Sequence, residues 1–145
     1  MPFYRFKTFS ADTRGSVAII FAFVFVPMLT LVGGAVDYAR WLHAKTAQQA
    51  AIDSAVLAAA RTLQVTSGDA TRATNIGASY YQTMKSTWTK TDSASFDIDQ
   101  NASMIRGATS ATITTPFLNL AGIDHLKIFA TAQAALQHAS VAGTS

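Results

Sequence analysis

The feature that most constrains the fold is an uninterrupted apolar run near the amino terminus. From Ser16 to Val36 no charged side chain occurs, and Arg14 and Asp37 are the charged residues that flank the run. As a helix at 1.5 Å per residue the run is about 32 Å long, which matches the hydrocarbon thickness of a bilayer. A helix buried in a soluble protein rarely stays uncharged over such a length. The run therefore predicts a transmembrane helix.

The charges before the run predict its orientation. The basic groups there outnumber the single acidic residue, Asp12; they are the amino terminus, Arg5, Lys7 and Arg14. The short basic flank of a transmembrane helix tends to stay in the cytoplasm. We therefore expect residues 1–15 to be a cytoplasmic basic N-terminus, residues 16–36 a transmembrane helix and residues 37–145 an extracytoplasmic domain.

The helical pattern continues beyond the apolar run. From Asp37 to Leu63 the chain has no Pro or Gly, and strong helix formers dominate. Both parts together predict one helix from about Ser16 to Leu63, which would be about 72 Å long. Its second half has a mainly apolar stripe at three- and four-residue steps, and Gln48 is expected to face water. The stripe consists of Leu42, Gln49, Ile52, Val56, Ala59 and Leu63.

The same helix carries a column of alanines at four-residue spacing, broken only at His43. The column consists of Ala35, Ala39, Ala47, Ala51, Ala55 and Ala59. Small residues at this spacing let a second helix approach closely. Alanine is also the best helix former. Packing on the chain's own domain and packing on a neighbouring subunit would both produce this column, so the pattern alone leaves the partner open.

The rest of the chain predicts a second helix and three strands. Asp69 is a suitable N-cap for a helix with an apolar stripe, whose members are Ala73, Ile76, Tyr80, Met84 and Trp88. A polar link over residues 89–94 then leads to period-two alternation. This alternation predicts a short strand around Phe96, a longer one over residues 105–114 and a last one from Leu126 to Leu136.

Residues that typically begin and end helices predict a single helical turn before the last strand. Thr115 is the expected N-cap, Pro116 the first helical position and Gly122 the stop. Three strands after two helices indicate an α+β fold with an antiparallel sheet, and the long helix is expected to cover its apolar face.

Little in the sequence indicates catalysis or metal binding. His43, His125 and His138 are scattered over three elements without ligand spacing. Asp97 and Asp99 share one face of a strand, a spacing that could bind a cation, although charges on a solvent face are commoner. The chain has no cysteine, and its basic residues are dispersed rather than clustered. We expect a non-enzymatic protein with no catalytic residue, cofactor, metal site or nucleic-acid partner.

Three fates are compatible with the apolar run. A prepilin-type peptidase could cut between Gly15 and Ser16, a signal peptidase could cut after Ala35, or the run could stay uncut as a single-pass anchor. Cleavage after Ala35 would give a small secreted binding module that uses the sheet face with Asp97 and Asp99. That module is the alternative to a membrane protein.

Both ends of the chain resemble one known family. The first segment is RGSVAIIFAFVFVPMLTLVGGAVDYARW followed by AKTAQQAAIDSAVLAAAR. It is similar to the amino-terminal module of the TadE/TadG-like family, the pseudopilin-like components of bacterial tight-adherence (Flp) pilus assembly. The second segment is SATITTPFLNLAGIDHLKIFATAQAAL, which resembles the sheet region of that family.

The resemblance implies a pilin-like fold, with a long N-terminal helix packed on a three-stranded antiparallel sheet and one additional helix. It also implies a single-pass protein of the bacterial inner membrane, with the N-terminus cytoplasmic and the C-terminal domain periplasmic or extracellular. The implied role is adhesion-pilus assembly, as a minor pseudopilin or envelope-anchoring component acting through helix packing. The implied partners are the lipid bilayer and other pilus-assembly or pseudopilin subunits, with no small-molecule substrate.

The sequence departs from the family pattern in two places. Prepilins that join a filament usually carry a glutamate five residues into the mature chain, where this chain has Ile20, and the sequence contains no glutamate. This departure favours the TadG-like side of the family. Longer TadG-like members carry a von Willebrand factor A-like domain with a metal-dependent adhesion motif, and we expect no such domain here.

Overall fold

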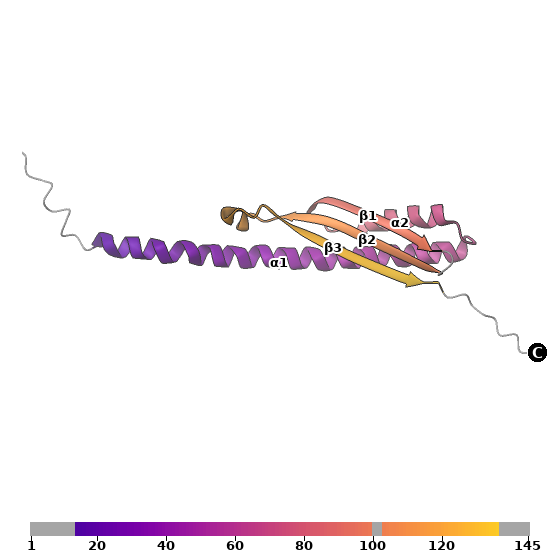
Figure 1. Cartoon of the computed structure of the whole chain (residues 1–145), viewed down its shortest axis with the longest axis horizontal. Helices are drawn as coiled ribbons and strands as arrows, with labels where there is room; N and C mark the ends of the chain where they lie inside the picture. Colours follow the sequence, from indigo (N-terminus) through magenta and orange to yellow (C-terminus); the bar gives the residue numbers. More distant parts are fainter. Residues whose placement is uncertain (1–13, 100–102, 137–145) are drawn as a thin grey trace, which may run out of the picture.

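A computed structural model describes residues 14–99 and 103–136 of the chain. Most of the expected cytoplasmic segment and His138 lie outside these residues. The elements follow the predicted order and confirm the α+β fold (Figure 1). They are α1 (Arg14–Val65), α2 (Ala70–Met84), β1 (Thr89–Asp99), β2 (Met104–Thr114), the 3₁₀ turn η2 (Leu118–Ala121) and β3 (His125–Ala135).

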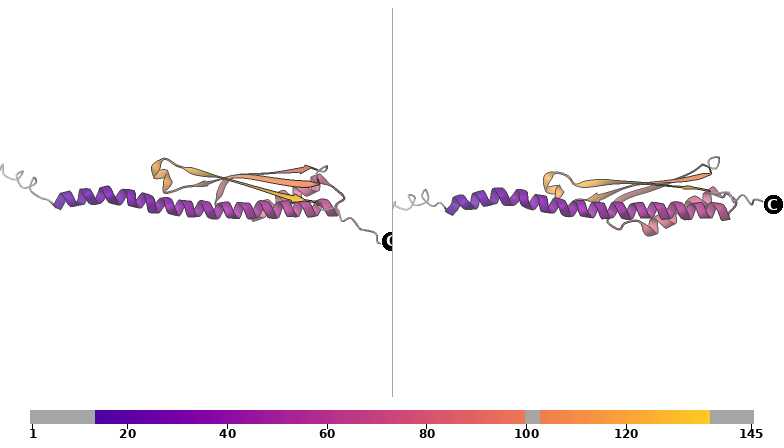
Figure 2. Two further views of the ribbon diagram at one scale, coloured as in Figure 1. Left: turned by 60° about the horizontal axis from the view of Figure 1, so that its bottom comes forward. Right: turned by 90° about the horizontal axis from the view of Figure 1, so that it is seen from below.

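Helix α1 is the longest element, with 52 residues and a length of about 78 Å. It continues through Pro27, although proline supplies no backbone N–H there. The amino-terminal part of α1 projects as a bare rod, whereas the sheet and α2 pack along its carboxy-terminal part (Figures 1 and 2). The prediction of one uninterrupted helix is therefore confirmed, and it extends slightly beyond both expected ends.

The three strands form an antiparallel sheet in the order β1-β2-β3. Alternate residues of β2 are buried and face α1; they are Ile105, Gly107, Thr109, Ala111 and Ile113. The intervening residues form the outer face. Strand β1 is longer than expected, because the residues from Thr89 onward also pair with β2 after an irregularity between Thr89 and Asp92. An ion pair of 2.9 Å between Lys85 and Asp92 connects the end of α2 to this strand.

Close approach between elements depends on small residues. A Cβ atom added to Gly107 would lie 2.5 Å from Cγ2 of Val56, and one added to Gly77 would lie 3.2 Å from Cβ of Ala59. Helix α2 therefore buries Ala73, Gly77 and Tyr81 against α1. The predicted apolar stripe of α2 is confirmed at Ala73, but beyond it the stripe was wrong by one position, because Gly77 and Tyr81 are buried in place of Ile76 and Tyr80.

A polar cluster lies inside the core where α1, α2 and β2 meet. Gln48 Nε2 donates to the Tyr81 hydroxyl and, at 2.9 Å, to Thr109 Oγ1. The two hydroxyl oxygens are 2.6 Å apart. Burial raises the pKa of the Tyr81 phenol, which favours its protonated, hydrogen-bonding form. The expectation that Gln48 faces water was wrong, because its side-chain NH₂ group has hydrogen-bond acceptors on two other elements inside the core.

We expect Gly107→Ala to destabilise the domain by about 1–3 kcal/mol, because the new methyl group must displace Val56 or the strand. Ala108→Val is the matched control, since it adds apolar atoms to the exposed outer face of the same strand. Thermal unfolding in detergent micelles, followed by circular dichroism, measures the difference. Equal unfolding midpoints for the two variants would contradict this account of the sheet–helix contact.

Candidate membrane and assembly interface

The amino-terminal half of α1 exposes apolar side chains along its whole length. Residues 15–29 are all exposed, and Phe23, for example, is 80% exposed. The helix contains an 18-residue window of mean hydropathy 2.5, of which only 6% is buried. Such an apolar surface requires a lipid or protein environment rather than water. Among the described elements, α1 is the one helix long and apolar enough to cross a membrane.

The domain first contacts α1 at the end of this apolar segment. A Cβ atom added to Gly33 would lie 2.7 Å from Cβ of Phe117, and one added to Gly34 would lie 3.3 Å from Cδ2 of Leu118. The two glycines therefore let the chain between β2 and β3 lie directly on the helix. We call this chain, residues 115–124, the β2–β3 turn.

A buried carboxylate fixes the β2–β3 turn to the helix. Asp37 is only 1% exposed, and its Oδ2 accepts hydrogen bonds from the backbone N–H groups of Phe117 at 2.8 Å and Leu118 at 2.7 Å. These N–H groups lie at the start of η2, where a helix has no internal acceptors for them. The guanidinium of Arg40 lies 3.9 Å from the other carboxylate oxygen. Asp37 thus acts as the cap of η2, although it belongs to α1.

This arrangement corrects the predicted role of Thr115. Its side chain does not cap η2, because its hydroxyl donates to the carbonyl oxygen of Ile123 instead. The Thr115 N–H also donates to the Asp124 carbonyl at 3.2 Å, which closes the base of the turn. Gly122 adopts a left-handed φ of 84° at the end of η2, so the prediction of a glycine stop is confirmed.

Two side chains of α1 bind the outer edge of β3. Trp41 Nε1 donates to the Lys127 carbonyl at 3.1 Å, and Gln49 Nε2 donates to the Thr131 carbonyl at 2.9 Å. Eight residues of helix and four residues of strand both span about 12–13 Å, so the donors and acceptors are in register. The edge of β3 is thereby fixed along the helix just beyond Asp37.

Aromatic and basic side chains gather on α1 just beyond Asp37 and on the loop between α2 and β1. We call them the aromatic collar: Tyr38, Arg40, Trp41, Lys45 and Trp88. The Tyr38 and Trp41 rings stack with centroids 5.7 Å apart, and Lys45 Nζ lies 5.1 Å from the Trp41 centroid. Arg40 lies 5.8 Å from the Trp88 centroid. Tyrosine, tryptophan and basic residues together are typical of a membrane–water interface.

The alanine column is divided between two environments. Ala51, Ala55 and Ala59 are buried within the domain, and Ala47 is half-buried. Ala35 and Ala39 are exposed. At 100° per residue they lie about 200° around the helix from Gly33 and Asp37, so they are on the side away from the β2–β3 turn. The column therefore serves the chain's own core at one end and leaves a free small-residue surface at the other.

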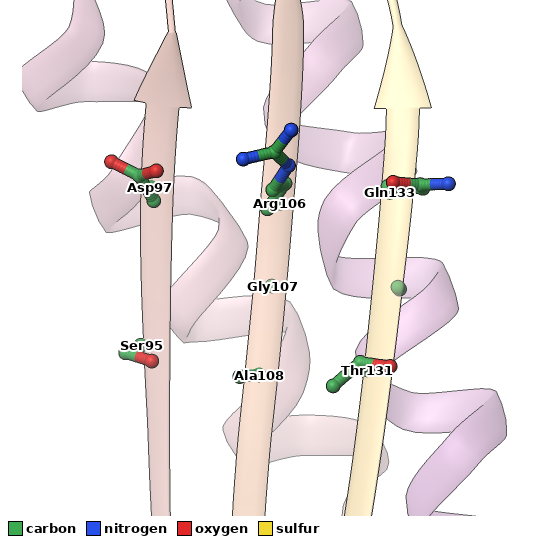
Figure 3. Close-up of a pocket in the computed structure, with 8 residues that line it drawn as sticks. Ser95, Asp97, Arg106, Gly107, Ala108, Thr131 and Gln133 are labelled. Atoms are coloured by element: carbon green, nitrogen blue, oxygen red, sulfur yellow. The ribbon is translucent and has the colours of Figure 1, made fainter.

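The remaining candidate residues lie apart from this interface. Gly15 and Ser16 are in the exposed first turn of α1. Asp97 pairs in register with Arg106 on the outer face of the sheet, and Asp99 pairs with Met104. A shallow depression of about 500 Å³ on that face includes Asp97 but not Asp99 (Figure 3).

The structure brings no metal-binding set together among the residues that it describes: no three His, Cys, Asp or Glu side chains are grouped there to hold a metal ion. His43 instead stacks on Trp88, with ring centroids 5.1 Å apart.

Comparison with known proteins supports the resemblance at the amino-terminal end. The Tad family model, whose description is "Putative Flp pilus-assembly TadE/G-like", matches residues 15–62. The match covers the apolar segment, Gly33, Gly34, Asp37 and almost all the rest of α1, and it confirms the predicted family resemblance over this third of the chain. Together with the apolar helix, it fits a Tad-related membrane component. Searches of curated proteins and of solved structures found no match.

We expect Gly33→Ala to loosen the β2–β3 turn, because its methyl group would overlap Phe117 at the Cβ position. Gly34→Ala is the matched control, since it makes the same change one residue later against the flexible end of Leu118. Hydrogen exchange at the Phe117 and Leu118 amides should be about tenfold faster in Gly33→Ala, which corresponds to about 1.4 kcal/mol. Equal exchange in both variants would show that the glycine contact does not hold the turn.

Proposed function

We propose that the protein is a non-enzymatic, single-pass membrane component of a tight-adherence (Flp) pilus assembly system, acting as a minor pseudopilin or envelope-anchoring subunit. The observation that carries the proposal is the continuity of α1. Its first half is bare and apolar, its second half is the core helix of the domain, and the family match extends over both. A chain built in this way presents its domain at a fixed distance and orientation from the membrane.

The proposed topology follows from the flanking charges and from the interface at Asp37. Residues 1–15 are cytoplasmic, residues 16–36 span the inner membrane, and residues 37–145 form the periplasmic or extracellular domain. The aromatic collar supports the position of the outer boundary, because it begins immediately after Asp37.

The proposed assembly surface is the side of α1 that carries Ala35 and Ala39. These small residues are exposed and lie opposite the β2–β3 turn, so a neighbouring helix can approach without displacing the domain. Ala51, Ala55 and Ala59 contribute to the chain's own core, which leaves the surface near the membrane boundary for a partner. The partner is another pilus-assembly or pseudopilin subunit.

The alternative, a secreted module cut after Ala35, is less compatible with the contacts of the turn. Cleavage there would remove Gly33 and Gly34, on which Phe117 and Leu118 lie, and would leave Asp37 next to a new amino terminus. The depression on the outer sheet face would remain. The observed packing therefore favours retention of the apolar segment on the mature protein.

We expect amino-terminal sequencing of the protein from its native host to give Met1 or Ser16 as the first residue. Retention of the apolar segment predicts either result, and processing between Gly15 and Ser16 predicts the second. A first residue of Val36 would support the secreted module instead.

We expect a cysteine at Ala39 to form crosslinks with Tad pilus components in native membranes. The chain has no cysteine of its own, so single-cysteine variants report on one position each. Ala108→Cys is the matched control, because Ala108 is an exposed alanine on the outer sheet face. Mass spectrometry identifies the crosslinked partners. An Ala39→Cys protein that fractionates with membranes but crosslinks to no Tad component would contradict the assembly role.

A further inference from the structure

The β2–β3 turn exposes three apolar side chains, Phe117, Leu120 and Ile123, which we call the tip of the turn. Leu120 is 82% exposed, and Phe117 and Ile123 are each 44% exposed. The segment from Thr115 to Ile123 contains no charged residue. Three exposed apolar side chains close together on one turn favour contact with a partner or an apolar phase.

The backbone of the tip is suited to an apolar phase. The N–H groups of Phe117 and Leu118 donate to Asp37, and that of Ile123 donates to the Leu118 carbonyl at 3.1 Å. The N–H groups of Leu120 and Gly122 also have acceptors within the turn, at 3.1 Å and 2.9 Å. Backbone donors that are already paired remove the main cost of contact with lipid.

The position of the tip relative to α1 favours lipid as the occupant. Phe117 lies on Gly33, within the apolar segment and one helical turn before Asp37. From Gly15 to Gly33 the helix rises about 27 Å, which is close to the roughly 30 Å thickness of the hydrocarbon core. Figures 1 and 2 show η2 as the part of the domain that reaches furthest toward the bare half of α1. A bilayer spanned by α1 would therefore have its outer boundary at the level of the tip.

The aromatic collar lies on the water side of this level. Tyr38 and Trp41 follow Asp37 by one residue and by about one turn, and Arg40 and Lys45 lie against the collar tryptophans. Side chains of these types locate at the headgroups. With the collar at the headgroups, Leu120 and Phe117 lie toward the acyl chains.

We propose that the β2–β3 turn is a second membrane contact, in which Leu120, Phe117 and Ile123 insert into the outer leaflet beside the transmembrane part of α1. The occupant of this surface is the lipid bilayer. The proposal rests on the proposed function only in requiring that α1 spans the membrane. Because Asp37 fixes the turn to one side of α1, the second contact also fixes which side of the helix faces a neighbouring subunit.

The test uses spin labels on single-cysteine variants of the full chain in phosphatidylcholine–phosphatidylglycerol liposomes. Leu120→Cys reports on the tip, and Phe23→Cys reports on the apolar segment. Leu57→Cys is the aqueous control, because Leu57 is 64% exposed on the domain half of α1. Oxygen concentrates in lipid, whereas a hydrophilic nickel complex stays in water, so the ratio of label accessibility to the two measures insertion. We expect the ratio at residue 120 to approach that at residue 23 and to exceed that at residue 57 severalfold.

Three results would overturn the proposal, and they are distinguishable. A lipid-like ratio at residue 23 with an aqueous ratio at residue 120 removes the second contact and leaves the transmembrane helix. Aqueous ratios at both positions would also contradict the proposal that α1 spans the membrane. An immobilised label at residue 120 that neither reagent reaches assigns the tip to a protein neighbour. Unchanged hydrogen exchange at the Phe117 and Leu118 amides verifies that the labelled turn is still docked on Asp37.

Discussion

The hydrogen bonds that Asp37 accepts join the two halves of the molecule. A buried carboxylate is costly unless it is paired or hydrogen-bonded, and here Oδ2 accepts from two backbone N–H groups of the β2–β3 turn while the Arg40 guanidinium lies 3.9 Å from Oδ1. Hydrogen bonds to a charged group contribute about 1.5–3 kcal/mol each. Since β2 and β3 both lead into this turn, its position on α1 determines where the sheet begins. The glycines one turn earlier on the helix give the turn the space to reach the carboxylate.

The sequence was sufficient to predict the elements but not their contacts. The period of the apolar residues and the helix-breaking residues predict α1, the three strands and the end of η2 at Gly122, because these signals are local in the sequence. The cap of η2 could not be found in this way, since Asp37 precedes its partners by 80 residues or more. Thr115 had a suitable side chain in the expected place, yet its hydroxyl found an acceptor inside the turn. The burial of Gln48 could not be predicted either, because its hydrogen-bond partners, Tyr81 and Thr109, lie on other elements.

Small residues were the most informative and the most ambiguous signal in α1. Ala51, Ala55 and Ala59 of the alanine column are buried, but the four-residue spacing alone does not say which helix approaches. The structure assigns Ala55 and Ala59 to α2, where Gly77 provides the matching small residue. Ala35 and Ala39 have the same spacing but lie opposite the turn and exposed. The same spacing therefore serves internal packing at Ala55 and Ala59 and leaves Ala35 and Ala39 exposed near the end of the apolar segment.

The absence of a linker within α1 has a mechanical consequence. Flexible linkers let a domain reorient independently of its anchor, whereas α1 runs without interruption from Arg14 to Val65. Rotation of the apolar part about the axis of α1 therefore turns the sheet with it, and in the proposed topology an axial pull on the domain is transmitted along α1 to the bilayer. The hydrogen bonds to Asp37 hold the β2–β3 turn, and with it the sheet, against the side of α1. In the proposed pilus-assembly role, torque and tension on the membrane-spanning part would thus be transmitted directly to the domain.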